Sequence, residues 1–488
     1  MTLIRLYRSS IRLFIVLALL FCSLTQPAEA QANLTRVAIL PFGTPKGQTD
    51  LEQYGVGTMD TLIQALSALP QFVMIDRARI ESILQEQQFA QTGMVDTQTA
   101  VAVGKIVGAQ SLITGNILKA GNLVRITAHF TDMKTGQIGQ SEVVTGPLDS
   151  IFDLMDQLAR KFIEASGVQV TAEQQQRVSA VTKATASLGA YDYYLQGRKS
   201  YLKFTNDGYE DAVKLYKKAI EADPQYALAY AGLAEALDFW GYAKYVNGGS
   251  ATEEYQQAMD MAQKAVALDP NLPEAHRALG GAGKNLGTPG FVAELQKALE
   301  LKPNDAESWY QLWWATSNNK NPDHEYILKA LALNPDLATA HHDRGVALYD
   351  LDRYDESINE YKEALRITPN KVSSHLGIAN ALSQMKRFDE AIAEYQTTIQ
   401  LEPNYAYTHT GLGTLYYTLK RYDESIAEFK AGLAINPNID VAHFNLGLAY
   451  MEQGHWDDAV SEWQETLRVN PQYSRAQEWI DYAKTKRQ

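Results

Sequence analysis

The sequence has almost no cysteine. Cys22 is the single cysteine among 488 residues, and it lies within an apolar run near the N-terminus. The chain after residue 22 therefore has no thiol for a disulfide, for a zinc or iron–sulfur site with cysteine ligands, or for a cysteine nucleophile.

Basic residues are too few for a nucleic-acid-binding chain. Lys and Arg number 44 against 57 Asp and Glu, which gives a net charge of −13, and no basic stripe is present. An acidic chain of this kind is a poor ligand for a phosphate backbone, so we predict no nucleic-acid partner.

Catalytic motifs are also missing. The sequence contains neither H-E-x-x-H nor G-x-S-x-G, and residues 281–285 depart from a phosphate loop because Asn285 follows Lys284 where Ser or Thr is required. We therefore predict no catalytic residues, no metal site, no cofactor and no enzymatic activity.

Long apolar runs are absent except at the N-terminus. Three arginines precede the apolar residues 13–22, and Ala28-Glu29-Ala30 supplies small residues two apart. This order predicts a signal peptide over residues 1–30 and an exported protein in the periplasm or cell envelope. The apolar run falls short of the roughly 20 residues that span a bilayer, so a membrane anchor is disfavoured. Lipidation of Cys22 is disfavoured because bulky Phe21 precedes it.

A 34-residue period dominates the second half of the chain. Prolines recur at positions 335, 369, 403, 437 and 471, and Pro224, Pro270 and Pro303 extend the series with less regular steps. Proline ends a helix, so each interval predicts one repeated helical unit.

The residues between the prolines resemble the tetratricopeptide repeat (TPR) over residues 189–471. Small residues recur on the first helix of a unit and aromatic residues on the second, as in Gly345 with Tyr361 and Gly447 with Trp463. Acidic residues such as Asp355 and Asp389 begin the second helix, where we expect them to cap it. The resemblance implies eight helical hairpins stacked into a superhelix, with a capping helix over 472–488.

Three departures from the period are informative. The unit from Pro224 to Pro270 is longer than the others, and we expect the extra residues around 241–250 to connect its two helices. Trp313 stands where a small residue is expected, and Gly280, Gly281 and Gly283 weaken one helix. These features predict a local opening near residues 280–320.

Residues 31–167 lack the period and predict an α/β domain with a mixed sheet, followed by a linker over 168–188. The expected strands are 36–42, 72–77, 111–118, 123–130 and 138–144, and the expected helices are 51–68, 78–88, 96–107 and 148–166. Segments such as Val37-Ala-Ile-Leu-Pro-Phe42 and Gly108-Ala-Gln-Ser-Leu-Ile-Thr-Gly115 resemble the CsgG-like family, the curli assembly component and its relatives. The resemblance implies an envelope-associated domain that can self-associate, without the membrane hairpins of a pore.

Histidines recur at one position of the repeat. Neighbouring helices pack roughly 8–10 Å apart, so histidines of successive units cannot share one metal ion. We predict that they pack as rings inside each unit. The histidines are His276, His341, His375, His409 and His443.

The first helices of the later units supply the candidate binding surface. The TPR resemblance implies that these helices line the concave side, and their exposed positions are aromatic, apolar or uncharged. The absence of Lys and Arg there argues against a clamp for a peptide carboxylate. The predicted protein-binding residues are Thr339, His342, Tyr349, Leu376, Asn380, Tyr407, Thr410, Thr414, Tyr417, Phe444, Leu448 and Met451.

The sequence thus predicts an α/β domain with a mixed sheet followed by an all-α TPR superhelical solenoid. We expect an exported, non-enzymatic scaffold that binds a protein partner in the TPR groove and has no transmembrane span in its mature form. The alternative is a regulator of a cell-wall synthase or of a secretion machine.

Overall fold

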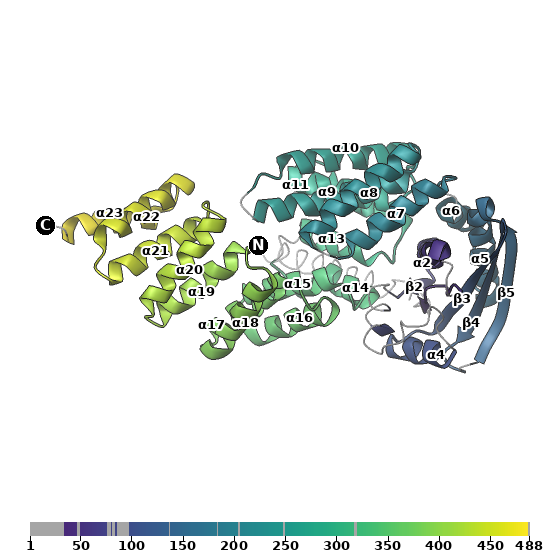
Figure 1. The fold of residues 1–488 in the computed structure, drawn as a ribbon, viewed down its shortest axis with the longest axis horizontal. Coiled ribbons are helices and arrows are strands. Elements are labelled where there is room, and N and C mark those ends of the chain that lie inside the picture. Colours follow the sequence, from purple (N-terminus) through teal and green to yellow (C-terminus); the bar gives the residue numbers. More distant parts are fainter. Residues whose placement is uncertain are drawn as a thin grey trace, which may run out of the picture.

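The computed structural model describes residues 34–45, 49–75, 80, 83–84, 97–135, 137–182, 184–203, 205–246, 249–316 and 320–486. The predicted signal peptide and most of the helix expected at 78–88 lie outside these residues. The α/β domain lies at one end of the molecule, and the helical solenoid extends from it to the C-terminal helix at the other end (Figure 1).

The N-terminal domain is built on a five-stranded mixed sheet, as predicted. Its order is β2-β1-β3-β4-β5. β1 runs parallel to both β2 and β3, while β4 pairs antiparallel with β3 and with β5. The strands are β1 (Thr35–Ile39), β2 (Phe72–Met74), β3 (Ser111–Ala120), β4 (Leu123–Asp132) and β5 (Gln137–Pro147).

Successive side chains of β1 point to opposite faces of the sheet, and both faces are buried. Val37 and Ile39 face a core that contains residues of α2 (Thr49–Ser67) and α5 (Ile151–Ser166). Ala38 and Leu40 face the opposite side and pack with residues of α4 (Thr97–Ile106). Burial on both sides explains the continuous apolar run of this strand.

The span expected to be a linker contains helix α6 (Ala172–Thr182). Val178 on this helix is fully buried, and Thr182 donates a hydrogen bond to Asp156 Oδ1 at 3.0 Å. Part of this span is therefore packed onto the N-terminal domain.

Successive helix pairs form the solenoid, as the fold prediction stated. The pairs begin with α7 and α8 and end with α21 and α22, and α23 follows them (Figure 1). The helices are α7 (Leu188–Tyr201), α8 (Asn206–Ala222), α9 (Ala227–Val246), α10 (Thr252–Leu268), α11 (Pro273–Leu286), α12 (Phe291–Leu301), α13 (Ala306–Thr316), α14 (Glu325–Leu333), α15 (Ala338–Tyr349), α16 (Tyr354–Ile367), α17 (Val372–Gln384), α18 (Phe388–Leu401), α19 (Ala406–Thr418), α20 (Tyr422–Ile435), α21 (Asp440–Glu452), α22 (Trp456–Val469) and α23 (Ser474–Lys486).

A small residue and an aromatic ring fit together inside each regular unit. A Cβ atom added to Gly447 would lie 2.5 Å from Trp463 Nε1, and one added to Gly413 would lie 2.9 Å from the ring of Phe429. Both aromatic side chains are fully buried. This packing confirms the predicted pairing of small residues with rings.

The unit with Trp313 reverses this arrangement. Trp313 lies on the first helix, is fully buried, and donates from Nε1 to the carbonyl oxygen of Asn321 at 2.9 Å. The short second helix α14 contributes the small buried residue Ala330 to the same core cluster. The bulky side chain has therefore moved from the second helix to the first.

Two local expectations need correction. The extra residues around 241–250 were expected to connect two helices, but residues 241–246 instead extend α9. Lys244 stabilises this extension, because its Nζ lies 2.5 Å from Glu254 Oε1 and 3.9 Å from the centre of the Trp240 ring.

The acidic residues Asp355 and Asp389 do not cap their helices. They lie in the first turn, and the N-cap positions belong to Arg353 and Arg387, with no side-chain capping bond at either position. The acids there still favour the helix through its dipole. Each arginine instead pairs with the glutamate three residues later at 2.7 Å.

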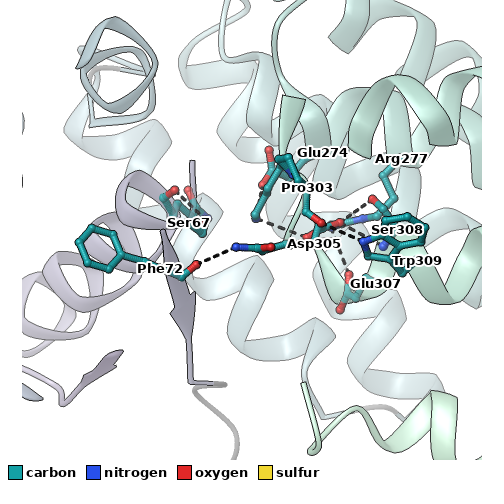
Figure 2. Close-up of polar contacts among 12 residues, drawn as sticks. Ser67, Phe72, Glu274, Arg277, Pro303, Asp305, Glu307, Ser308 and Trp309 are labelled. Atoms are coloured by element: carbon teal, nitrogen blue, oxygen red, sulfur yellow. Dashed lines mark hydrogen bonds and ion pairs between the residues drawn. The ribbon is translucent and has the colours of Figure 1, made fainter. Parts of the chain in front are cut away.

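Among the described residues, contacts between the N-terminal domain and the solenoid include two well-separated groups of hydrogen bonds. At the first, Tyr191 of α7 donates to the carbonyl oxygen of Gly57 at 2.6 Å, and its hydroxyl lies 2.5 Å from Thr61 Oγ1. At the second, the Asn304 side-chain amide donates to the carbonyl oxygens of Pro70 and Phe72 at 2.7 and 3.3 Å. Figure 2 shows Phe72 facing the segment that contains Pro303 and Asp305. The two contacts fix the domain against the first half of the solenoid.

Candidate functional site

The first helices of the units form the inner row of the solenoid. α15 contacts α17, α17 contacts α19, and α19 contacts α21, whereas the corresponding contacts between second helices are weaker. Helices that approach more closely lie on the inside of a curved stack. The first helices therefore line the concave side, and these helices carry the predicted binding residues.

Several of the predicted residues are accessible. Thr414 and Tyr407 are exposed, and Tyr349 and Tyr417 are half-buried, each with its ring near that of a second tyrosine. The other half-buried members of the set are Thr339, His342, Leu376, Asn380, Leu448 and Met451. These side chains carry no fixed charge, so the later units present a neutral, partly aromatic surface.

Two of the predicted residues lie inside the protein. Phe444 is 2% exposed, and its ring centre lies 5.0 Å from that of Tyr473, which precedes α23. Thr410 is buried and donates its hydroxyl hydrogen to the carbonyl oxygen of Ala406 at 3.1 Å. Neither side chain is part of the accessible surface.

The first part of the concave side is occupied by a buried ionic network (Figure 2). Arg277 on α11 lies 2.8 Å from Glu235 on α9, 3.0 Å from Asp305 and 3.4 Å from Glu307 on α13. Lys302 also pairs with Asp305, at 3.4 Å. These opposite charges pair with one another and link consecutive units.

Within this network the pKa values of Glu235 and Asp305 are shifted in opposite directions. Burial raises the pKa of Glu235 to about 7 despite the opposing charge of Arg277. Burial alone would also raise the pKa of Asp305, but Arg277 and Lys302 hold it well below its usual range. The network is buried and internally paired, which is the pattern of a structural cluster.

A second polar group lies further along the concave side. Asp343 on α15 accepts a hydrogen bond from Tyr310. Burial raises the pKa of Asp343, and the positive charges of Lys371 and Lys284 oppose this rise. Lys284 lies 3.4 Å from the centre of the Trp314 ring. The neighbouring His342 has a pKa well below its usual range, because of burial and because of the charge of Lys371. The sequence prediction included only His342 of this group.

The prediction also missed two exposed tyrosines on the extension of α9. Tyr242 is 60% exposed and Tyr245 is 63% exposed. The signal that could have found them is the length of this unit, together with the absence of a helix breaker between Gly241 and Val246.

The repeated histidines pack inside their units, as predicted, and each bridges two acceptors. Nε2 of each ring lies 2.9–3.2 Å from the carbonyl oxygen of the proline six residues earlier. Nδ1 lies 2.6–2.8 Å from a glutamate of the second helix. Both partners are hydrogen-bond acceptors, so a ring that carries a proton on each nitrogen can donate to both.

The histidine pKa values follow this geometry. The hydrogen bonds to Glu394 and Glu428 raise the pKa values of His375 and His409, respectively. Burial would lower the pKa of His443, but the hydrogen bonds to Glu462 and Pro437 outweigh it, so that pKa is also raised. Across the described parts of the chain, no group of His, Asp and Glu is arranged to hold a metal ion.

Within the residues that the structure covers, no helix combines the length and the apolar character needed to cross a bilayer.

Models of known families match both parts of the chain. The family described as curli production assembly/transport component CsgG matches residues 24–129. Tetratricopeptide repeat families match residues 199–238, 347–386, 379–420, 413–454 and 441–473.

Two curated proteins are similar to parts of this chain. "Putative adenylate cyclase 3" of Rhizobium meliloti (strain 1021) is 26% identical over 245 residues, which cover 50% of this chain and 39% of that protein. "Small glutamine-rich tetratricopeptide repeat-containing protein 2" of Saccharomyces cerevisiae (strain ATCC 204508 / S288c) is 28% identical over 175 residues, covering 35% of this chain and 44% of that protein. The chain thus spans less than half the length of either relative.

A solved structure is similar in fold to about two thirds of this chain. A chain in the crystal structure of the APC/C hetero-tetramer Cut9-Hcn1 aligns with a TM-score of 0.51 at 15% identity, covering 68% of this chain and 63% of that one. The likeness concerns the fold alone. Together with the family matches, it shows that this chain combines a CsgG domain with a solenoid of tetratricopeptide repeats.

Proposed function

We propose that this chain is an exported, non-enzymatic adaptor that binds protein partners through the concave side of its solenoid. The observation that carries the proposal is the accessible, uncharged row on the first helices of the later units, which includes Tyr349, Thr414 and Tyr417. A surface with aromatic and apolar groups on rigid helices is suited to an extended or helical segment of another protein.

The proposed location is the periplasm or cell envelope. The signal-like N-terminal sequence and the match to the CsgG family support it. Fractionation of the native cells should find the mature chain, which begins near residue 31, outside the cytoplasm. Recovery of an uncleaved chain in the cytoplasm would contradict export.

Binding can be measured by affinity purification from an envelope extract. Tyr349→Ala and Tyr417→Ala should each reduce the amount of co-purified partner, whereas Tyr482→Ala on α23 should leave it unchanged. Thermal unfolding of each variant establishes that it is folded. Equal recovery with all three variants would place the interface elsewhere.

One relative is named as an adenylate cyclase, so a cyclase assay tests the proposal that this chain is not an enzyme. The concave side shows a paired charge network, and the Ser374 hydroxyl that contacts His342 Nδ1 at 3.0 Å is fully buried. The purified chain should therefore form no cyclic AMP from ATP and Mg²⁺. Turnover that survives repurification would contradict the proposal.

We also propose self-association through the N-terminal domain. β5 is an edge strand, and in the described part of the chain its outer edge pairs with no strand. Leu118, Leu123 and Val143 are exposed on neighbouring strands of the same sheet. Val143→Lys should shift the sedimentation of the chain toward a monomer; a monomeric native chain would contradict this part of the proposal.

Regulation of a cell-wall synthase or secretion machine is the second candidate function. The docking of the CsgG domain at both Tyr191 and Asn304 favours it, because a partner bound to the solenoid is then held at a fixed place relative to that domain. Identification of the co-purified protein separates the two candidates.

A further inference from the structure

The two edges of the N-terminal sheet differ in what covers them. β2 forms one edge and β5 forms the other, because the strand order is β2-β1-β3-β4-β5. β2 lies beside the solenoid, whereas β5 lies on the side that faces away from it (Figure 1). An uncovered edge leaves backbone N–H and C=O groups that can pair with another strand. The state of each edge therefore decides where the sheet can be extended.

The solenoid covers the β2 edge, which is only three residues long. Val73 is 6% exposed and packs in one apolar cluster with Trp313. The backbone of Phe72 is also fully bonded. Its N–H donates to the carbonyl oxygen of Leu69 at 3.1 Å, and its carbonyl oxygen accepts from the Asn304 side chain at 3.3 Å. This edge therefore offers little to an approaching strand.

The β5 edge lacks these protections. The strand is eleven residues long, its single charged residue is Glu142, and its proline, Pro147, is its last residue. Edge strands that resist pairing are usually short, charged, interrupted by proline or covered. Among the described residues, no strand pairs with the outer edge of β5. A long and nearly uncharged edge is therefore open to a further strand.

Glu142 does not protect this edge, because its charge is already paired. Lys161 on α5 lies 2.5 Å from Glu142 Oε2, on the side of the sheet that α5 covers. The residues of β5 that point to the opposite side, Ser141, Val143 and Thr145, are exposed. An approaching strand therefore meets hydroxyl groups and a valine rather than a free charge.

We propose that β5 pairs antiparallel with β5 of a second copy of this chain, centred on Val143, and that the solenoid limits the assembly to two copies by covering β2. In this register Val143 lies opposite Val143, and Ser141 lies opposite Thr145. Glu142 lies opposite Val144, whereas a register centred on Glu142 would place two carboxylates directly opposite each other, which destabilises a strand pair. The inference rests on the proposed self-association and specifies its partner strand and its extent.

The two-fold arrangement explains why assembly stops. Antiparallel pairing uses the β5 edge of both copies, so the joined sheet ends in two β2 edges, each covered by its own solenoid. A head-to-tail arrangement would instead join β5 of one copy to β2 of the next and could continue as a filament. The contact of Asn304 with the carbonyl oxygen of Phe72 opposes that arrangement.

Light scattering on the full mature chain measures the extent of assembly. The mass should correspond to two copies and should not rise further with concentration. A mass that keeps growing, or a larger closed ring, leaves the proposed self-association in place but overturns the limit to two copies. A monomer overturns both this inference and the proposed self-association.

Cysteine crosslinking tests the partner strand. The chain from residue 31 onward contains no cysteine, so an introduced thiol is the only one. Oxidation of Val143→Cys should link two copies, because residues directly opposite in an antiparallel pair have Cα atoms about 4.5–5.5 Å apart, which suits a disulfide. Tyr482→Cys, at an exposed position of α23, is the matched control. Equal crosslinking of the two variants overturns the assignment to β5.

Two further variants test the register. Ser141→Cys alone should not crosslink, because the two copies of this position lie roughly 13 Å apart along the paired strands. Co-expression of Ser141→Cys with Thr145→Cys should give a mixed crosslinked pair, because these positions lie opposite each other. Absence of the mixed pair overturns the register centred on Val143.

Asn304→Asp tests the role of the solenoid. The substitution removes the amide donor and places a carboxylate beside the carbonyl oxygens of Pro70 and Phe72. The β2 edge should then become available, and the mass should exceed two copies as the concentration rises. Asn404→Asp, at an exposed position in a later unit, is the matched control and should remain at two copies. A native mass for Asn304→Asp overturns the limiting role of the solenoid.

Discussion

Asn304 binds the carbonyl oxygen of Pro70 through its side-chain amide at 2.7 Å, across a sequence separation of 234 residues. The hydrogen bond joins the loop before α13 to the loop before β2 in the CsgG domain. Val73 on β2 packs with Ala306 and Trp313 beside it, so a polar contact and an apolar core meet at one junction.

Removing this contact should destabilise the chain. Asn304→Ala loses hydrogen bonds to two carbonyl oxygens and should lower the free energy of unfolding by about 1–2 kcal/mol in a urea titration. Asn404→Ala is the matched control, because Asn404 follows a proline in the same loop of a later unit and is exposed. Equal stability of the two variants would show that the junction contributes nothing.

Two glycines should respond oppositely to alanine. Gly447→Ala brings a methyl group to 2.5 Å from Trp463 Nε1, so the helices must separate, at a cost of about 1–3 kcal/mol in unfolding free energy. Gly281→Ala has its nearest neighbour, Gln311 Oε1, at 3.6 Å and should gain up to about 1 kcal/mol from helix propensity. Thermal unfolding of both variants measures the contrast; similar shifts would contradict the packing account.

The repeated histidines should make stability depend on pH. His375, His409 and His443 have raised pKa values in the folded chain, so their stabilisation is complete below the unfolded pKa of about 6.5 and is lost as pH rises through the folded pKa. Unfolding free energy should therefore fall between those two limits as the medium becomes more alkaline.

A single substitution isolates one of these pairs. Glu428→Gln removes the charged acceptor of His409 and should lower the pKa of His409, measured by NMR, while leaving that of His375 raised. An unchanged His409 titration would show that the hydrogen bond does not hold the proton.

Hydrogen exchange tests the opening predicted near residues 280–320. Gly280 and Gly283 weaken α11 intrinsically, although Leu295 and Phe291 pack directly against them. Because glycine lowers the stability of a helix, the amides of α11 should exchange faster than those of residues 372–471. Exchange as slow as in the later units would contradict the predicted opening.

The regular part of the fold was predictable because its signals are local. Each proline ends a unit, and Gly447 and Trp463 lie at a spacing that brings a small residue against a ring. The contact between Tyr191 and Thr61 has no such signal, since the residues are 130 positions apart and belong to different domains.

The candidate site was predictable only in part. The TPR resemblance implies that Tyr417 and Thr414 lie on the concave side, but it cannot indicate that Tyr473, which precedes the capping helix, covers Phe444. The composition of residues 241–246, which include Tyr242, is compatible with either a loop or a helix. The helix is stabilised by the contacts of Lys244 with Glu254 and Trp240, which no repeat pattern specifies.

Photo-crosslinking in the native cells shows which side of the solenoid binds the partner. A benzophenone amino acid at Thr414, which is exposed on α19, is compared with one at Gln464, which is exposed on the second helix α22. If the concave side binds the partner, Thr414 should give a discrete crosslinked partner and Gln464 should give none. A partner attached only through Gln464 would contradict the claim that the concave side is the binding surface.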